Sequence, residues 1–121
     1  MNKRFRLSRS IDFKRVRTQG SSFVHPLIVL VKGNDLSSSL RVGVSVSKAV
    51  GNAVQRNHAK RVLREIIRPL LGQLRTDVEF VLVARSSINK AKFADLQIAV
   101  AKLVHKAKLT TQTPTAGRII D

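Results

Sequence analysis

The chain has 121 residues, of which 23 are Lys or Arg and 7 are Asp or Glu, so its formal net charge is +16. This length is enough for one compact domain and too short for two, and the excess of cations favours a polyanionic partner, with nucleic acid as the first candidate. The lack of cysteine excludes disulfides and thiolate metal sites, and no apolar run approaches the length of a membrane span, so we expect a cytoplasmic protein with no membrane partner.

Residues 1–9 form a basic arm that also contains Phe5 and Leu7. We expect part of the arm to pack on the domain while its cations extend toward a nucleic acid, and the arm to become fully ordered only on that partner. The cations of the arm are Lys3, Arg4, Arg6 and Arg9.

A short helix is predicted after the arm, with Ser10 as its N-cap and Gly20 as its end. Phe13 and Arg17 are four residues apart and therefore share one face of this helix. On composition alone, an isolated phenylalanine such as Phe13 is most often a core anchor.

Two strands are predicted next. Residues 23–32 are rich in β-branched and apolar side chains, and Pro26 indicates an edge strand or an irregular start. Within this strand, Leu27, Val29 and Val31 share one face. Residues 40–46 alternate apolar with small or charged residues, as in a half-buried strand, and the polar connection between the two strands predicts a hairpin.

The stretch from Lys48 to Arg68 predicts an amphipathic helix with a cationic face and a core face. Its cations recur at three- and four-residue steps, and solvated helix faces normally mix both signs, so this face indicates a surface that binds a polyanion. The cations are Arg56, Lys60, Arg61, Arg64 and Arg68, and Glu65 is the one acidic residue among them. Asn52 is the favoured N-cap, Ser47 is the alternative, and Gly72 marks the expected end.

The remaining part of the chain completes one domain. Residues 78–84 are nearly all apolar, which predicts a strand buried on both faces, and a helix between two strands implies a crossover with a right-handed default. Asn89 is expected to cap a last helix whose apolar residues cover the sheet. We assign residues 1–109 to a single domain and expect the Thr-rich residues 110–121 to form a flexible tail.

The sequence offers no constellation typical of a protein nuclease. Its acidic residues are dispersed, and His25, His58 and His105 have no carboxylate at a suggestive spacing. It also lacks a glycine-rich phosphate loop. We therefore predict no catalytic residue and no metal site in this chain.

The central stretch closely resembles the motif of the bacterial ribonuclease P protein subunit. The matching positions are Lys48, Val50, Gly51, Ala53, Val54, Arg56, Asn57, Lys60, Arg61, Arg64, Glu65 and Arg68. In that family the motif is often named for Arg-Asn-Arg, and this chain carries His58 at the third place. Asp12, Phe13, Lys14, Val16 and Gly20 also look like the first helix of the family.

The resemblance implies an α/β fold of the α+β sandwich type. It implies a small central β-sheet with about three helices, in the order αβββ and then αβα, and a left-handed βαβ crossover. It also implies an RNA subunit as the partner, which holds the catalytic Mg²⁺ and cleaves the 5′ leader from precursor tRNA. The protein itself is then expected to need no cofactor and no obligate protein partner.

The resemblance assigns residues to two surfaces. The residues expected to contact the RNA subunit and precursor tRNA are Lys48, Arg56, Asn57, His58, Lys60, Arg61, Arg64 and Arg68. A cleft for the single-stranded leader is expected to involve Phe13, Arg17 and Val31, with bases stacking on the Phe13 ring. Composition alone leaves one alternative open, a structural RNA-binding protein such as a ribosomal protein.

Overall fold

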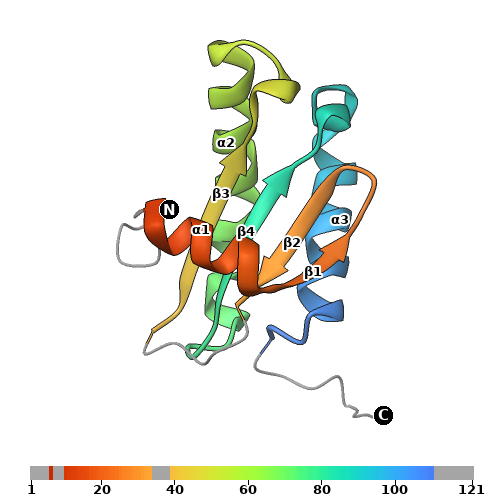
Figure 1. The fold of residues 1–121 in the computed structure, drawn as a ribbon. Coiled ribbons are helices and arrows are strands. Elements are labelled where there is room, and N and C mark those ends of the chain that lie inside the picture. Colours follow the sequence, from red (N-terminus) through yellow and green to blue (C-terminus); the bar gives the residue numbers. More distant parts are fainter. Residues whose placement is uncertain (1–5, 7–9, 34–38, 111–121) are drawn as a thin grey trace.

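The computed structural model describes residue 6, residues 10–33 and residues 39–110, without the side chains of residues 10–13. Its main elements are α1 (Ser10–Gln19), β1 (Ser21–Val24), β2 (Ile28–Lys32), β3 (Arg41–Val46), α2 (Ala53–Ile67), β4 (Glu79–Ala84) and α3 (Phe93–Lys106). Within these described residues, short 3-10 helices accompany them: η2 (Lys48–Val50), η3 (Arg68–Gln73) and η4 (Ser86–Lys90). The expected order αβββαβα is confirmed (Figure 1). Among the described helices, none is long and apolar enough to cross a membrane.

The sheet is mixed and has the strand order β1-β2-β4-β3. β4 is antiparallel to β2 and parallel to β3, so β3, α2 and β4 form the crossover unit. In Figure 1 both strands point upward, α2 lies behind the sheet and β4 lies to the right of β3, which makes the crossover left-handed. About 98% of such crossovers are right-handed. The right-handed crossover expected by default was therefore wrong for this chain, and the left-handed crossover implied by the resemblance is confirmed.

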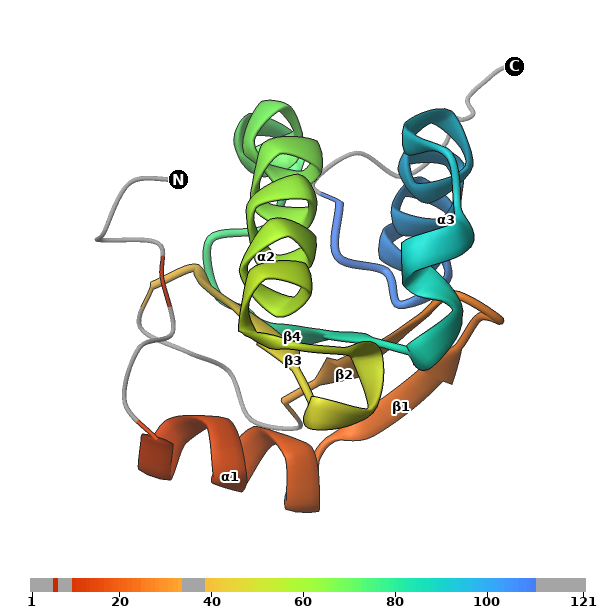
Figure 2. The same cartoon turned by 90° about the horizontal axis from the view of Figure 1, so that it is seen from above.

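Helices cover both faces of this sheet. α2 and α3 lie side by side on one face, and α1 lies on the other (Figure 2). The main core, between the sheet and the helix pair, includes Leu30, Leu63, Phe80, Leu82 and Val100, all fully buried. A smaller cluster under α1 consists of Val16, Val31 and Val81.

The prediction of one strand over residues 23–32 was wrong, because the chain reverses within that range. β1 and β2 pair antiparallel, and the residues between them form a tight turn around Pro26. The His25 N–H donates to the Ile28 carbonyl at 2.9 Å, and the Leu27 N–H donates to His25 Nδ1 at 3.1 Å. Pro26 has no N–H to contribute to a ladder, so a turn suits it better than a strand interior.

The predicted hairpin between β2 and β3 was also wrong, because β4 lies between them. β4 carries apolar side chains on both faces, and Val81 and Leu82 are fully buried. A strand of this kind belongs in the middle of a sheet, where neighbours cover both of its edges and helices cover both of its faces. The residues of β2 and β3 alone do not indicate that another strand lies between them.

α2 begins at a capping box. The Gln55 N–H donates to Asn52 Oδ1 and the Asn52 N–H donates to Gln55 Oε1, both at 2.9 Å, so Asn52 is the N-cap as expected. Ser47 precedes η2 and forms no side-chain cap bond there. Gly51 has a φ of 148°, and a Cβ on it would lie 1.9 Å from Gln55 Oε1, so the box requires glycine at this position.

The C-terminal end of α2 and the N-terminal cap of α3 differ from the prediction. α2 ends at Ile67 and not at Gly72, because Pro69 cannot donate an i to i−4 hydrogen bond, and the chain tightens into η3. Asn89 lies in η4 and does not cap α3, whose N-cap residue is Lys92. Thr110, the first residue of the expected tail, forms an isolated bridge with Leu74, and residues 111–121 lie outside the described part of the chain.

We predict that Asn52→Ala lowers the free energy of unfolding by about 1 kcal/mol, because it removes the acceptor for a first-turn N–H. Urea denaturation followed by circular dichroism measures this change. Ser47→Ala is the matched control, since it removes a side chain without a cap bond and should stay within about 0.5 kcal/mol of the parent protein. An equal loss in both variants would contradict a capping role that is specific to Asn52.

Candidate nucleic-acid interface

α2 presents its cations on the side that faces away from the sheet. Its buried residues are Ala59, Leu63, Ile66 and Ile67, which fix the orientation of the helix on the main core. Opposite them, Arg61 and Arg68 are exposed, and Arg56, Lys60 and Arg64 are half-buried. The apolar stripe thus holds four cations on one side of α2, and Arg68 follows directly after the helix at the start of η3.

Carboxylates neutralise little of this charge. Glu65 forms an exposed ion pair with Arg68, with 2.7 Å between Arg68 Nη2 and Glu65 Oε2. Within the described part of the chain, Arg56, Lys60, Arg61 and Arg64 form no ion pair. Arg56 instead donates from Nη1 to the Gly51 carbonyl at 3.0 Å, which holds its guanidinium near the start of the helix. Cations that have no counter-charge suit a polyanionic ligand.

The surroundings of Arg64, which include Arg6, disfavour its positive charge. Arg6 pairs with Val42 as an isolated parallel bridge, so the Arg6 backbone lies alongside β3 at the edge of the sheet. Arg64 Nε is buried without a hydrogen-bond partner. Burial, followed by the nearby charge of Arg6, lowers the pKa of the Arg64 guanidinium below its ordinary value. Two guanidiniums close together would be stabilised by a phosphate group between them.

The other residues expected to contact RNA lie on α2 or near it in the chain. Lys48 is exposed in η2, directly after β3, and Asn57 is exposed in the second turn of α2. His58 is exposed on the flank of α2 that is closer to α3, where it lines a pocket with Phe93. Lys3, Arg4 and Arg9 of the basic arm lie outside the described residues.

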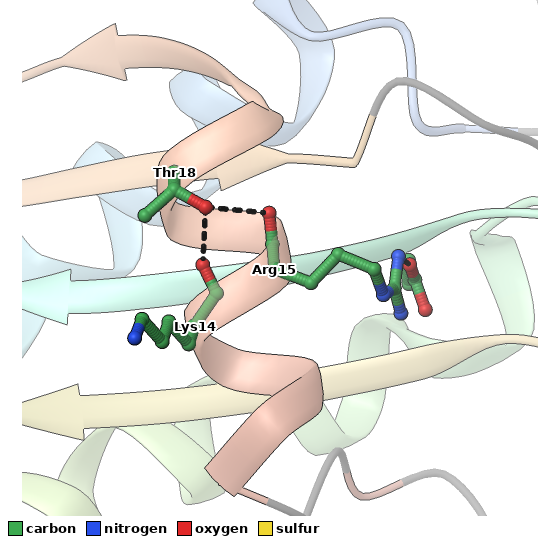
Figure 3. A network of polar contacts seen from close by, with 4 residues as sticks. Lys14, Arg15 and Thr18 are labelled. Carbon is green, nitrogen blue, oxygen red and sulfur yellow. Dashed lines mark hydrogen bonds and ion pairs between the residues drawn. The ribbon is translucent and has the colours of Figure 1, made fainter.

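α1 carries a second set of polar groups on the opposite face of the sheet. The Arg15 guanidinium pairs with Glu79, whose side chain is buried at the start of β4. Lys14 and Arg15 leave the helix in opposite directions, and the Thr18 hydroxyl donates to the Lys14 carbonyl at 2.8 Å (Figure 3). Arg17 is exposed. Phe13 lies on α1, one turn before Val16, and its side chain is outside the described part of the structure.

The structure places Val31 beneath α1, where it is only 5% exposed and packs with Val16 and Val81. An open apolar strip lies on the next row of the same sheet face, where Val24 pairs with Val29 and Val29 pairs with Val83. Val24 is 60% exposed and the other two are half-buried. The sequence analysis missed this strip, because its three residues come together only through the strand order.

The described residues contain no group of three or more His, Cys, Asp or Glu side chains that could hold a metal ion. The α2 surface presents guanidinium and ammonium groups, and an apolar strip lies near α1, which carries the exposed Arg17. Such groups bind phosphates and bases.

These features define a small basic α+β protein with a cationic helix face. A sequence model of the family described as Ribonuclease P matches residues 1–108. A "Ribonuclease P protein component" from Streptococcus pneumoniae is 39% identical over 110 residues, which cover 91% of this chain and 87% of that protein. The chain therefore belongs to the ribonuclease P protein family. Its role is that of the protein subunit of this endoribonuclease, which implies a partner RNA subunit.

Solved structures agree with this assignment. The RNase P protein from Staphylococcus aureus superimposes with a TM-score of 0.77 at 26% identity, over 93% of this chain and 97% of that one. A mutant of the S. aureus protein, described as having defective mRNA degradation activity, gives 0.78 at 28% identity over 88% and 91%. The Thermotoga maritima protein gives 0.69 at 26% identity over 84% and 96%. The expected fold class is confirmed, and the ribosomal-protein alternative is set aside.

We predict that Arg64→Met raises the melting temperature while weakening RNA binding. The lowered pKa of Arg64 means that the charged form is less favourable in the folded protein than in the unfolded chain, so at all pH values below that pKa the charge reduces stability. Methionine retains apolar packing without the charge. Arg61→Met is the control. Because Arg61 is exposed, the melting temperature of this variant should equal that of the parent protein. A fall in melting temperature for Arg64→Met would show that the guanidinium contributes a favourable contact.

Proposed function

We propose that the cationic face of α2 binds the RNA subunit of ribonuclease P, and that the apolar strip beside α1 receives the 5′ leader of precursor tRNA. One observation carries this proposal: four cations of α2 form no ion pair within the described part of the chain. They are Arg56, Lys60, Arg61 and Arg64. Arginine can bind a phosphate through two parallel N–H groups, and each neutralised phosphate releases condensed counterions.

The surface near α1 suits single-stranded RNA better than duplex RNA. Its apolar residues Val24, Val29 and Val83 offer contact to base faces, which are exposed only where bases are unpaired. Arg17 lies on the exposed side of α1 and supplies a cation for the backbone. Phe13 occupies the same helix and would add a stacking ring. Val31, buried under α1, would support this surface without touching the leader.

The proposal divides the labour between protein and RNA. The RNA subunit would hold the catalytic Mg²⁺, and the protein would bring two polyanions together and position the leader, with no cofactor of its own. It would work in the cytoplasm and need no obligate protein partner. Catalysis would then improve through substrate binding and metal affinity, because the cations of the protein reduce repulsion between the two RNAs.

We expect that alanine replacement of Arg56, Lys60, Arg61 or Arg64 weakens binding to the RNA subunit. The logarithm of the association constant decreases linearly with the logarithm of the salt concentration. The magnitude of this slope should decrease by about one for each phosphate that the variant no longer neutralises. Arg68→Ala should have a smaller effect, because Arg68 is already paired with Glu65. Filter binding at several salt concentrations measures both the affinity and the slope.

Lys102→Ala is the matched control for these variants, since Lys102 is an exposed cation on α3. A second assay tests the activity itself: the parent chain should restore cleavage of precursor tRNA by a bacterial ribonuclease P RNA at low Mg²⁺, and the chain alone should not cleave. Unchanged affinity and slope in all of the α2 variants, or no restoration of cleavage by the parent chain, would refute the proposal.

We further expect that Phe13→Leu in the holoenzyme weakens binding of precursor tRNA and leaves binding of mature tRNA, which lacks the leader, almost unchanged. Leucine keeps much of the apolar volume and loses the ring, and a base–aromatic stack is worth roughly 1–3 kcal/mol by alanine substitution. Equilibrium binding of the two RNAs measures the difference.

Phe23→Leu is the control, because it makes the same chemical change on the opposite face of the sheet, where Phe23 packs against the main core. Melting curves show whether either variant loses stability. If Phe13→Leu weakens binding of both RNAs equally, or greatly lowers the melting temperature, Phe13 is a core anchor and does not bind the leader.

A further inference from the structure

A pocket of about 140 Å³ lies between α2, η4 and the start of α3, on the side of the sheet opposite α1. Its floor is apolar and consists of Ala59, Val62, Ile88 and Leu96. An apolar cavity of about 150 Å³ can hold one benzene molecule. The pocket therefore has room for a single flat ring.

The mouth of the pocket carries groups that suit an aromatic heterocycle. Phe93 lines the pocket and is 48% exposed, so part of its ring is open for stacking. Asn89 also lines it, and its Nδ2 donates to the Val50 carbonyl at 2.5 Å. This bond fixes the amide, whose carbonyl oxygen is a hydrogen-bond acceptor. His58 adds a second flat ring with two nitrogens, from the α2 side.

Three exposed cations are neighbours of the lining residues in the chain. Arg61 lies one helical turn beyond His58, and Lys90 and Lys92 flank Ala91, which also lines the pocket. The one acidic residue in the first turn of α3 is Asp95. A ligand with an apolar ring and negative charge at its edges would complement this arrangement, whereas a neutral peptide would leave the cations unused.

We propose that this pocket binds an unpaired nucleobase of a bound RNA, with the base against Phe93 and the phosphates on either side of it near Arg61, Lys90 and Lys92. The inference rests on the proposed function, since it adds a base-binding site to a protein whose α2 binds RNA. The pocket shares no residue with the strip beside α1, and the sheet separates the two. An unpaired base is required because bases inside a duplex do not expose their faces.

Nuclear magnetic resonance of the ¹⁵N-labelled full chain tests whether a base enters the pocket. Addition of UMP, whose base is a single ring, should shift the amide resonances of Ala59, Asn89 and Phe93. Ribose 5-phosphate, which has the same phosphate and no base, should leave them in place. Equal shifts with both compounds, or UMP shifts confined to the strip beside α1, would overturn the inference.

Affinity for a labelled hexauridylate, measured by fluorescence anisotropy, tests the contribution of the Phe93 ring. Phe93→Ala should weaken binding roughly 5- to 150-fold, with an unchanged salt slope because the variant keeps every cation of the parent chain. Ala91→Leu, which narrows the pocket and keeps the ring, should also weaken binding. Ile98→Ala is the control, since Ile98 is 53% exposed on the same helix and does not line the pocket.

Parent-like binding by both Phe93→Ala and Ala91→Leu would overturn the inference. If the α2 charge variants still lower the salt slope in that case, the proposed function stands without the pocket. Absence of salt-dependent RNA binding by the parent chain would refute the proposed function, and the pocket inference with it. Melting curves of each variant ensure that a loss of affinity is not a loss of fold.

Discussion

The burial of β4 on both faces is the constraint on which the rest of the structure depends. Phe80 and Leu82 point into the main core and Val81 into the small cluster under α1, so helices must cover both sides of this strand. The crossover from β3 brings α2 to one face of the sheet, and α1 covers the other face. Because β2 and β3 both pair with β4, the position of every surface described above is set by this central strand.

The same packing explains how α2 can carry unpaired cations. Buried apolar residues such as Leu63 and Ile67 stabilise the helix on the sheet, and the capping box at Asn52 completes its first turn. The cations on the opposite side contribute little to this packing. The cost of placing them there is visible at Arg64, where burial and the charge of Arg6 disfavour the guanidinium. Such a cost is common at functional surfaces, where a ligand supplies the missing partner.

The sequence predicted those features that depend on local pattern. The helical periods of α1 and α2, the N-cap of α2 at Asn52 and the double burial of β4 were correct because they follow from residues close together in the chain. Ser10 was predicted as the N-cap of the first helix, but it is the first residue of α1 and not the residue before it. The β1–β2 turn and the insertion of β4 between β2 and β3 were missed, because pairing depends on competition between distant strands. The left-handed crossover followed only from the family resemblance. The strip at Val24, Val29 and Val83 depends on strand order, and the pocket at Phe93 depends on the contact between two helices, so neither has a local signal.

The arrangement of layers has a consequence for binding two RNAs at once. The cations of α2 and the pocket beside them lie on one side of the sheet, and the strip near α1 lies on the other, so the two surfaces share no residue. A ligand on one side leaves the other side accessible. Any energetic coupling between the two surfaces has to pass through the packed sheet. Free-energy changes at distant sites without shared partners generally add, so substitutions on the two surfaces should have independent effects. A rigid two-sided scaffold of this kind is what a subunit needs if it is to hold an RNA partner and an RNA substrate simultaneously.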